Sequence, residues 1–249
     1  MKKVKTILVS QPEPKTETSP YFDLAEKQKV KIDFQPFIHV EGVDASEFRK
    51  QKVSLSDHSA VILTSRNAVD HFFRMAEECR FAVPDTMKYF CMSEAIAYYL
   101  QKYVVYRKRK IYFGKQTFAD LMELIKKHKS EKFLLPSSDI LKPIIPESLD
   151  QGGIDYNRAI LYRTVCSDLS HLENVFYDIL VFFSPSGIQS LLKNFPEFKQ
   201  NDTRLAAFGS TTAKAVKEAG LRLDIEAPTA QAPSMTMALE QYIKKANKR

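Results

Sequence analysis

The sequence predicts an α/β fold made of two similar α/β domains, each with a parallel sheet flanked by helices. Short apolar runs rich in β-forming residues alternate with amphipathic helical segments along all 249 residues. This alternation is typical of the strand–helix units that build parallel sheets. The alternation also restarts near residue 132 with similar residues in a similar order. Such an internal repeat indicates two halves of the same kind.

The first half begins with a buried-type strand at residues 6–10. A helix follows from Ser19, because serine is a typical N-cap and Pro20 suits the first helical position. Residues 32–40 alternate as a strand does, but Pro36 makes them an edge strand or a linker. Residues 48–55 suit an amphipathic segment or a loop. Further strands are expected at 60–63, 88–91, 104–106 and 110–113, and helices at 68–78, 94–103 and 117–127.

The second half repeats this order of elements. Strands are expected at residues 132–135, 154–164, 179–183, 205–208 and 221–225. Helices are expected at residues 140–149, 188–192, 213–220 and 234–246, and the first of these is interrupted by Pro143 and Pro146.

Three pairs of segments show the repeat directly. Residues 154–160 match residues 32–38 at an offset of 122, residues 184–188 match 65–69 at 119, and residues 208–213 match 92–97 at 116. Any one pair could match by chance. Three pairs in the same order, with slowly drifting offsets, indicate equivalent strand–helix units in the two halves.

Composition and charge limit the kind of ligand. The net charge of +7 favours an acidic partner, and the densest basic runs, 107–110 and 244–249, are expected to be solvated. Nucleic-acid binding requires basic residues interleaved with exposed aromatic residues on one face, and we find no such module. We therefore expect a small polyanionic substrate and no nucleic-acid partner.

Cysteine and histidine usage argues against a disulfide framework or a metal site. The three cysteines are widely spaced and lack paired histidines, and the five histidines (His39, His58, His71, His128 and His171) show no ligand spacing. We expect these histidines at surface or packing positions. No apolar run of about eighteen residues and no signal peptide is found, so we expect a cytoplasmic protein that does not enter a membrane.

The candidate site lies where two predicted strands give way to helices. Ser184-Pro185-Ser186-Gly187 follows the strand at 179–183, and Gly209-Ser210-Thr211-Thr212 follows the strand at 205–208. Free backbone N–H groups and hydroxyls at neighbouring helix N-termini bind anions at the carboxyl edge of a parallel sheet. Simple helix capping by these residues is the alternative.

The same segments carry a resemblance to a known family. Phe182-Phe-Ser-Pro-Ser-Gly187, Phe208-Gly-Ser-Thr-Thr-Ala213 and Ile160-Leu-Tyr-Arg-Thr164 resemble uroporphyrinogen-III synthase, and the likeness extends over nearly the whole chain. It implies two α/β domains joined by a two-stranded β-ladder, with linker strands near 32–40 and 154–163. Domain one would then be discontinuous, residues 1–35 and 164–249, with domain two, residues 36–163, inserted in it.

The resemblance also implies an activity. Members of the family close the linear tetrapyrrole hydroxymethylbilane, with inversion of the last pyrrole ring and loss of water, to give uroporphyrinogen III in haem biosynthesis. They use no metal or organic cofactor, and we expect a monomer. Tyr162 matches the family's tyrosine at the interdomain cleft, and the resemblance implies that this catalytic residue donates a hydrogen bond or a proton to the leaving hydroxyl. A linker tyrosine packed on one domain is the alternative. The matched substrate-binding residues are Ser184, Ser186, Gly187, Gly209, Ser210, Thr211, Thr212, Ser65 and Arg66.

Three positions depart from the family pattern. Ser93 and Ile96 stand where the domain-two turn usually has glycine and threonine, and Ser210 replaces a common proline. From these differences we expect stronger substrate contacts in domain one than in domain two. The alternative function is a non-catalytic two-domain protein that binds a small polyanionic ligand or regulates through it, since one fold can serve many functions.

Overall fold

The structure, a computed structural model, describes residues 2–16, 18–115 and 117–248. Met1, Glu17, Gln116 and Arg249, which fall in the expected domain ranges, lie outside the described residues. The chain divides into two compact units. The first unit combines Met1–His39 with Val165–Arg249, and the second unit is Val40–Thr164. The sequence placed these boundaries at residues 35/36 and 163/164.

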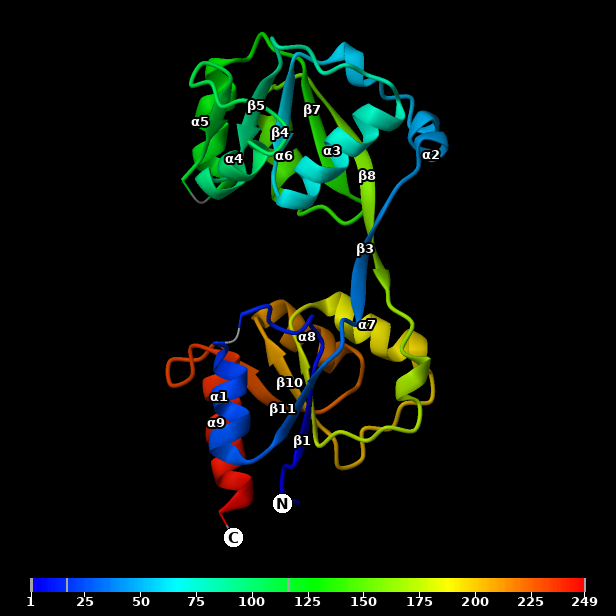
Figure 1. Ribbon diagram of the computed structural model, residues 1–249, viewed down its shortest axis with the longest axis vertical. Coiled ribbons are helices and arrows are strands. Elements are labelled where there is room, and N and C mark those ends of the chain that lie inside the picture. The colour runs from blue at the N-terminus through cyan, green and yellow to red at the C-terminus, as the bar shows by residue number, and fades with distance from the viewer. Residues whose placement is uncertain (1, 17, 116, 249) are drawn as a thin grey trace. The chain divides into compact units, whose positions relative to one another are not determined.

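The first unit contains a five-stranded parallel sheet in the order β11-β10-β9-β1-β2. The pairing of β1 with β9 joins the two parts of the chain, with Ile7 opposite Ile179, and on its other side β1 pairs with the edge strand β2, where Ile7 lies opposite Ile32. The strands are β1 (Thr6–Val9), β2 (Lys31–Phe34), β9 (Ile179–Phe182), β10 (Arg204–Phe208) and β11 (Leu223–Ala227). Helices α1 (Pro20–Gln28) and α9 (Met235–Asn247) cover one face, and α7 (Pro185–Asn194) and α8 (Ser210–Glu218) cover the other (Figure 1).

The second unit contains a six-stranded sheet in the order β3-β8-β7-β4-β5-β6. Its pairings from β8 to β6 are parallel. The strands are β3 (Ile38–Gly42), β4 (Ala60–Leu63), β5 (Lys88–Cys91), β6 (Ile111–Phe113), β7 (Phe133–Ser138) and β8 (Tyr156–Cys166). One face is covered by α2 (Ala45–Lys50), α3 (Arg66–Glu78) and α4 (Glu94–Leu100), and the other by α5 (Phe118–Lys127) and α6 (Ile144–Gln151) (Figure 1).

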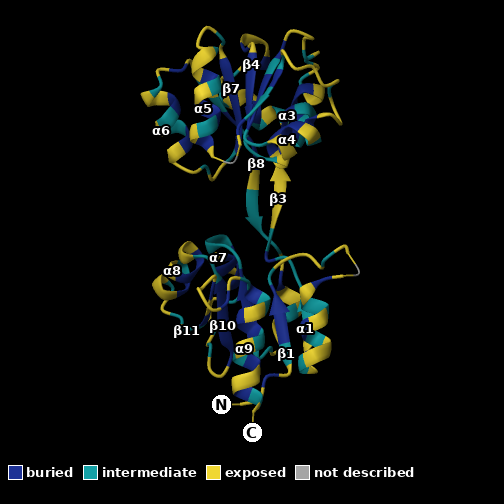
Figure 2. Cartoon of the chain, turned by 90° about the vertical axis from the view of Figure 1, so that its left-hand side faces the viewer, coloured by how far each residue is buried: buried dark blue, intermediate teal, exposed yellow. Residues whose placement is uncertain are grey.

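Strand β4 shows why these apolar runs form parallel strands. All four residues of β4 are buried. Val61 and Leu63 pack in the cluster beneath α3 and α4, whereas Ala60 and Ile62 pack beneath α5 and α6. A strand buried on both faces gains from an unbroken apolar run such as that of β4. Figure 2 shows that β4 and most of β7 are buried. The predicted fold class, two α/β domains with parallel sheets flanked by helices, is confirmed.

Some predicted elements differ from the structure. The strand expected at 104–106 is wrong, because these residues form no strand and Val105 is 79% exposed. The expected strand at 32–40 is divided at Pro36 into β2 and β3, which are edge strands of the two sheets. Helix α6 begins at Ile144 rather than 140, after Pro143 at its N-cap. Residues 48–55 hold the end of α2 and the start of a 3₁₀ turn, Leu55–Asp57.

The chain passes between the units within β3 and within β8, which are neighbours in the six-stranded sheet. Beyond Ile38, the residues of β3 are exposed (Figure 2). No helix in the described ranges is long and apolar enough to cross a membrane.

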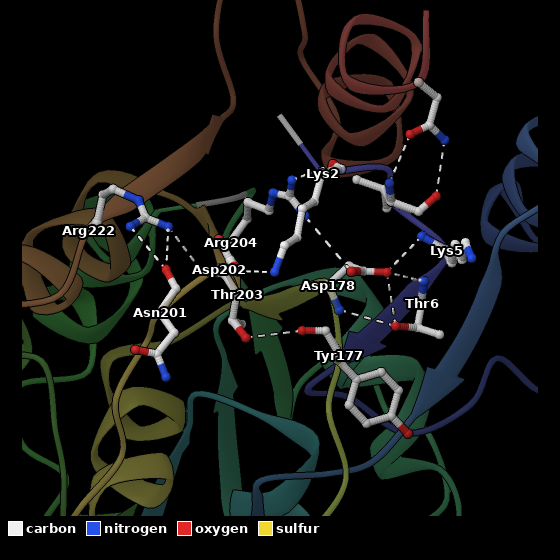
Figure 3. A network of polar contacts seen from close by, with 12 residues as sticks. Lys2, Lys5, Thr6, Tyr177, Asp178, Asn201, Asp202, Thr203, Arg204 and Arg222 are labelled. Carbon is white, nitrogen blue, oxygen red and sulfur yellow. Dashed lines mark hydrogen bonds and ion pairs between the residues drawn. The ribbon is translucent and has the colours of Figure 1, made fainter. Parts of the chain in front are cut away.

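A polar network joins the first residues of the chain to strands β9 and β10 (Figure 3). The Asp178 carboxylate accepts hydrogen bonds from the N–H groups of Lys5 (2.7 Å) and Thr6 (3.0 Å) and lies 3.9 Å from the Arg204 guanidinium. Arg204 is buried, and its Nη1 is a buried polar atom without a hydrogen-bond partner among the described residues. Asp178 is therefore the acidic counterpart of a buried cation as well as the acceptor that holds the start of β1.

We expect Asp178→Ala to lower the free energy of unfolding by about 2–4 kcal/mol, because it leaves two N–H groups and a buried cation without their acceptor. Urea denaturation monitored by circular dichroism measures this change. Asp202→Ala is the control, since Asp202 pairs with Lys2 at the exposed surface and its removal should leave the midpoint unchanged. Equal losses in the two variants would show that Asp178 has no special role.

Candidate functional site

The candidate residues lie at the carboxyl edges of the two sheets. In the first unit they follow β9 and β10, and in the second they follow β4 or lie in β8. The strands of a parallel sheet end at one edge, where side chains on successive loops lie close together and α/β folds usually bind ligands.

In the second unit the structure brings Tyr162 and Ser65 together. Their hydroxyl oxygens lie 3.2 Å apart. Ser65 is the N-cap of α3, and its Oγ accepts the N–H of Ala68 at 3.1 Å. Because Oγ already accepts a hydrogen bond, the Ser65 O–H is free to donate to the Tyr162 oxygen. The Tyr162 proton can then be donated to a ligand.

A register shift places Tyr162 in this position. Ser137 pairs with Ile160, but Ser138 pairs with Tyr162, so β8 contains one additional residue, Leu161. Consecutive residues of a regular strand point to opposite faces. Here both Leu161 and Tyr162 belong to the buried cluster that includes α3. Irregularities of this kind re-aim a side chain next to a site.

The environment keeps Tyr162 protonated at neutral pH. The side chain is 7% exposed, and burial raises the pKa of its phenol above the ordinary value. The Ser65 hydroxyl and the backbone of Ser138 oppose this rise in pKa by stabilising the phenolate. The phenol therefore keeps its proton at neutral pH, and Ser65 and the backbone of Ser138 are positioned to stabilise the phenolate if that proton is lost.

Two residues next to Tyr162 were not predicted as site residues. The imidazole of His71 stacks on the Tyr162 ring, with centroids 4.9 Å apart and planes 17° apart. Arg74 donates from Nε to His71 Nδ1 at 3.1 Å. His71 does occupy a packing position, as expected, but its partner is the candidate catalytic residue. The three-residue spacing on α3, which puts both side chains on one face, was the signal available.

Arg66 lies at the exposed start of α3. Its guanidinium carbon is 5.2 Å from the centre of the Tyr99 ring, over which Lys102 also lies at 4.2 Å. The Tyr99 hydroxyl donates to Asp70 at 2.8 Å. A cation at a helix N-terminus is unfavourable to the helix dipole. Anion binding there would offset that cost.

In the first unit, the turn after β9 is largely occupied by helix capping. Ser184 is the N-cap of α7 and accepts the N–H of Gly187 at 3.3 Å, with Pro185 in the first turn. Gly187 is buried, and a Cβ there would lie 3.2 Å from the Phe182 ring. Gly187 is thus explained by packing, and the half-buried Ser186 is the hydroxyl of this turn that has no capping bond.

The turn after β10 differs from the turn after β9. Helix α8 begins at Ser210, three residues earlier than predicted, and its N-cap Gly209 has φ 87° and offers no side-chain cap. Ser210 and Thr211 are exposed, whereas Thr212 is 1% exposed. The predicted carboxylate contact by the Thr212 side chain therefore does not fit its position. The uncapped N–H groups and the hydroxyls of Ser210 and Thr211 are the better candidates.

The two departures in the second unit lie at the start of α4. Ser93 is the N-cap of α4 but makes no side-chain capping bond, and Ile96 is buried in the cluster beneath α3 and α4. Isoleucine at this position adds to the core and offers no hydroxyl.

Possible metal ligands and the cavity in the first unit were compared with the candidate residues. No group of three or more His, Cys, Asp or Glu among residues 2–16, 18–115 and 117–248 could hold a metal ion. A cavity of about 670 Å³ lies toward the amino ends of β9 and β10, lined by apolar residues such as Leu172 and Phe198. The amides of Asn194 and Gln200 on its wall are hydrogen-bonded within the protein. No candidate site residue lines this cavity.

Comparisons with known proteins agree with the fold. Residues 19–237 match the sequence model of the family described as Uroporphyrinogen-III synthase HemD. A crystal structure of uroporphyrinogen-III synthetase from Helicobacter pylori is similar, with a TM-score of 0.60 and 20% identity over 97% of this chain and 100% of that one. A mutant uroporphyrinogen III synthase from Thermus thermophilus gives a TM-score of 0.55 and 15% identity over 99% and 100%. No curated protein sequence matches significantly.

The neighbours Thr211 and Thr212 allow the burial argument to be tested. We expect Thr212→Ala to lower the free energy of unfolding by about 1–2 kcal/mol, since it removes buried atoms from the face of α8 that packs on the sheet. Thr211→Ala, at the exposed neighbour, should change it by less than about 0.5 kcal/mol. Urea denaturation of both variants measures the difference. A larger loss in Thr211→Ala would contradict this assignment of the buried face.

Proposed function

The chain belongs to the uroporphyrinogen-III synthase family, and on that premise we propose that it closes hydroxymethylbilane to uroporphyrinogen III with loss of water. The match of the family over residues 19–237 is the observation that carries this proposal. The protein is thus an enzyme of tetrapyrrole biosynthesis, and in our proposal a carbon–oxygen lyase. We further propose that it acts as a cytoplasmic monomer without a nucleic-acid partner, metal or organic cofactor.

The reaction demands assistance and positioning rather than a strong nucleophile. The carbon–oxygen bond of the hydroxymethyl group breaks, and the electron-rich pyrrole supports the cation-like azafulvene that results. The departing hydroxide takes a proton and leaves as water. The last ring then bonds to this cationic carbon through its own substituted carbon. The bond from that substituted carbon to the neighbouring methylene bridge breaks and re-forms at the ring's free α-carbon, which loses its proton, and the ring is then inverted. Holding the chain in this geometry can lower the barrier by several kcal/mol.

Tyr162 is our candidate for the proton donor to the leaving hydroxide. Its phenol is held protonated by burial, and the Ser65 hydroxyl lies 3.2 Å from its oxygen. As the proton moves to the leaving group, negative charge develops on the phenol oxygen. A hydrogen bond from Ser65 then strengthens, so the pair stabilises the step in which charge appears.

The substrate carries many carboxylates, and the candidate residues offer donors for them. In the first unit these are the uncapped start of α8 with Ser210 and Thr211, and Ser186 in the turn before α7. In the second unit Arg66 stands exposed at the start of α3. Each hydrogen bond to a carboxylate contributes roughly 1.5–3 kcal/mol. Ser184, Gly187, Gly209 and Thr212 would then shape the backbone of these turns rather than present side chains to the substrate.

The decisive experiment is incubation of the purified protein with freshly prepared hydroxymethylbilane and separation of the product isomers. A synthase gives isomer III, whereas spontaneous closure gives isomer I. Isomer I alone, at the uncatalysed rate, would reject the proposed activity and favour the non-catalytic binding protein.

We expect Tyr162→Phe to lower kcat for isomer III formation about tenfold or more, because it removes the proton donor and keeps the ring. KM should change little, since the phenyl ring retains its packing. Steady-state kinetics on the folded variant measure both constants. An unchanged kcat would leave Tyr162 with a packing role only.

A further inference from the structure

A chain of side-chain contacts runs from Arg74 to the phenol of Tyr162. Arg74 Nε donates to His71 Nδ1 at 3.1 Å, the His71 ring stacks on the Tyr162 ring, and the Tyr162 hydroxyl lies 3.2 Å from that of Ser65. Arg74, His71 and Ser65 belong to α3 or to its N-cap, and Tyr162 belongs to β8. Each contact lies within the second unit.

The Arg74 contact determines the protonation of His71. The Nε of arginine always carries a hydrogen, so His71 Nδ1 must be the acceptor and cannot itself be protonated. The imidazole is therefore neutral, with its proton on Nε2. Protonation of Nδ1 would break the hydrogen bond and bring two cations together. Burial and the Arg74 charge accordingly lower the pKa of His71, opposed by the carboxylates of Asp70 and Glu78.

Arg74 also holds the backbone next to Tyr162. Its Nη2 donates to the carbonyl oxygens of Val43 at 2.7 Å and Leu161 at 3.0 Å, and its Nη1 pairs with Glu78. Leu161 is the additional residue of the register shift and immediately precedes Tyr162. One guanidinium thus binds both the peptide before Tyr162 and the imidazole that lies on its ring.

The space for this guanidinium depends on Gly42. A Cβ at Gly42 would lie 2.8 Å from Arg74 Cζ and 2.9 Å from Nη2, closer than such atoms approach in proteins. Gly42, the last residue of β3, therefore leaves room for the Arg74 guanidinium because it has no side chain. The carbonyl of the next residue, Val43, is one of its acceptors. A methyl group at position 42 would displace the guanidinium without removing any of its donors.

We propose that Arg74 is a positioning residue for Tyr162, which it holds through the neutral His71 imidazole and the Leu161 carbonyl so that the phenol points at Ser65. This inference rests on the proposed function, in which Tyr162 protonates the leaving hydroxide. A proton donor must meet its acceptor in a narrow geometry, and a misplacement of about 1 Å can lower the rate about a hundredfold. Stacking on His71 sets the orientation of the Tyr162 ring. The contacts of Arg74 with His71 and with the Leu161 carbonyl set the position of that ring.

The test compares variants in two backgrounds. Arg74→Lys keeps the positive charge but removes the forked donor, and we expect kcat for isomer III formation to fall about tenfold with KM changed less than about twofold. In the Tyr162→Phe background the same substitution should lower kcat by less than about twofold, because the group that Arg74 positions is absent. Gly42→Ala displaces the guanidinium and leaves Arg74 itself unchanged. It should also lower kcat about tenfold when Tyr162 is present and less than about twofold in the Tyr162→Phe background. Glu78→Gln, which leaves the bonds to His71 and Leu161 intact, should leave kcat unchanged.

The protonation of His71 can be measured by NMR spectroscopy on the unmodified protein. The ¹⁵N shifts of His71 should show Nδ1 unprotonated and Nε2 protonated, and its pKa should lie below about 6.5. Protonated Nδ1 would overturn the Arg74–His71 contact. Equal fold-losses from Arg74→Lys in the two backgrounds would overturn the positioning role, because the effect would not pass through Tyr162. Absence of isomer III from the unmodified protein would reject the proposed function, and with it the catalytic part of this inference.

Discussion

The pairing of β1 with β9 is the contact on which the architecture depends. It joins residues 7–9 to residues 179–181 and places the N-terminal strand between β2 and β9, in a sheet whose other three strands come from residues 179–227. All pairings of this sheet are parallel, so its strands end at one edge. The starts of α7 and α8 lie beside each other only because β9 and β10 are neighbours in it.

At that edge, two helix starts that look alike in sequence differ in their hydrogen bonds. The N–H of Gly187 is already bound by the Ser184 side chain, whereas the start of α8 has only Gly209 at its N-cap. A satisfied donor contributes little to a ligand, and an unsatisfied one contributes a full hydrogen bond. We therefore expect an anionic ligand of the first unit to be bound mainly at the turn after β10.

The sequence predicted features that depend on neighbours along the chain. Helix capping was the alternative interpretation of the turn at Ser184, and Ser184 does cap α7, as Ser65 caps α3. Whether the Thr212 side chain is buried or exposed depends on the residue at which α8 begins. A start at Ser210 puts Thr212 on the buried face with Ala213 and Val216. Ile96 likewise lies in the core. Nothing local to these residues shows which face the helix will bury.

Individual side-chain contacts and strand registers between distant segments could not be predicted. The position of Tyr162 depends on a register shift against β7, and no pattern within residues 154–164 indicates it. Arg74 finds its acceptors in Val43 and Leu161, 31 and 87 residues away. The repeat and the alternation of apolar runs with helical segments indicate which residues form strands. Which residues surround the Tyr162 phenol depends on how those strands pair and on how α3 packs against them.

The discontinuous first unit has a consequence for the order of folding during synthesis. All residues of the second unit, Val40–Thr164, leave the ribosome before β9 does. The second unit can therefore complete its sheet while β1 and β2 still lack their neighbour. Until residue 179 is synthesised, β1 presents one unpaired edge and its apolar faces to the surroundings. The nascent chain thus carries a folded insert next to an unfinished sheet, and that interval is when it is most exposed to aggregation and to chaperones.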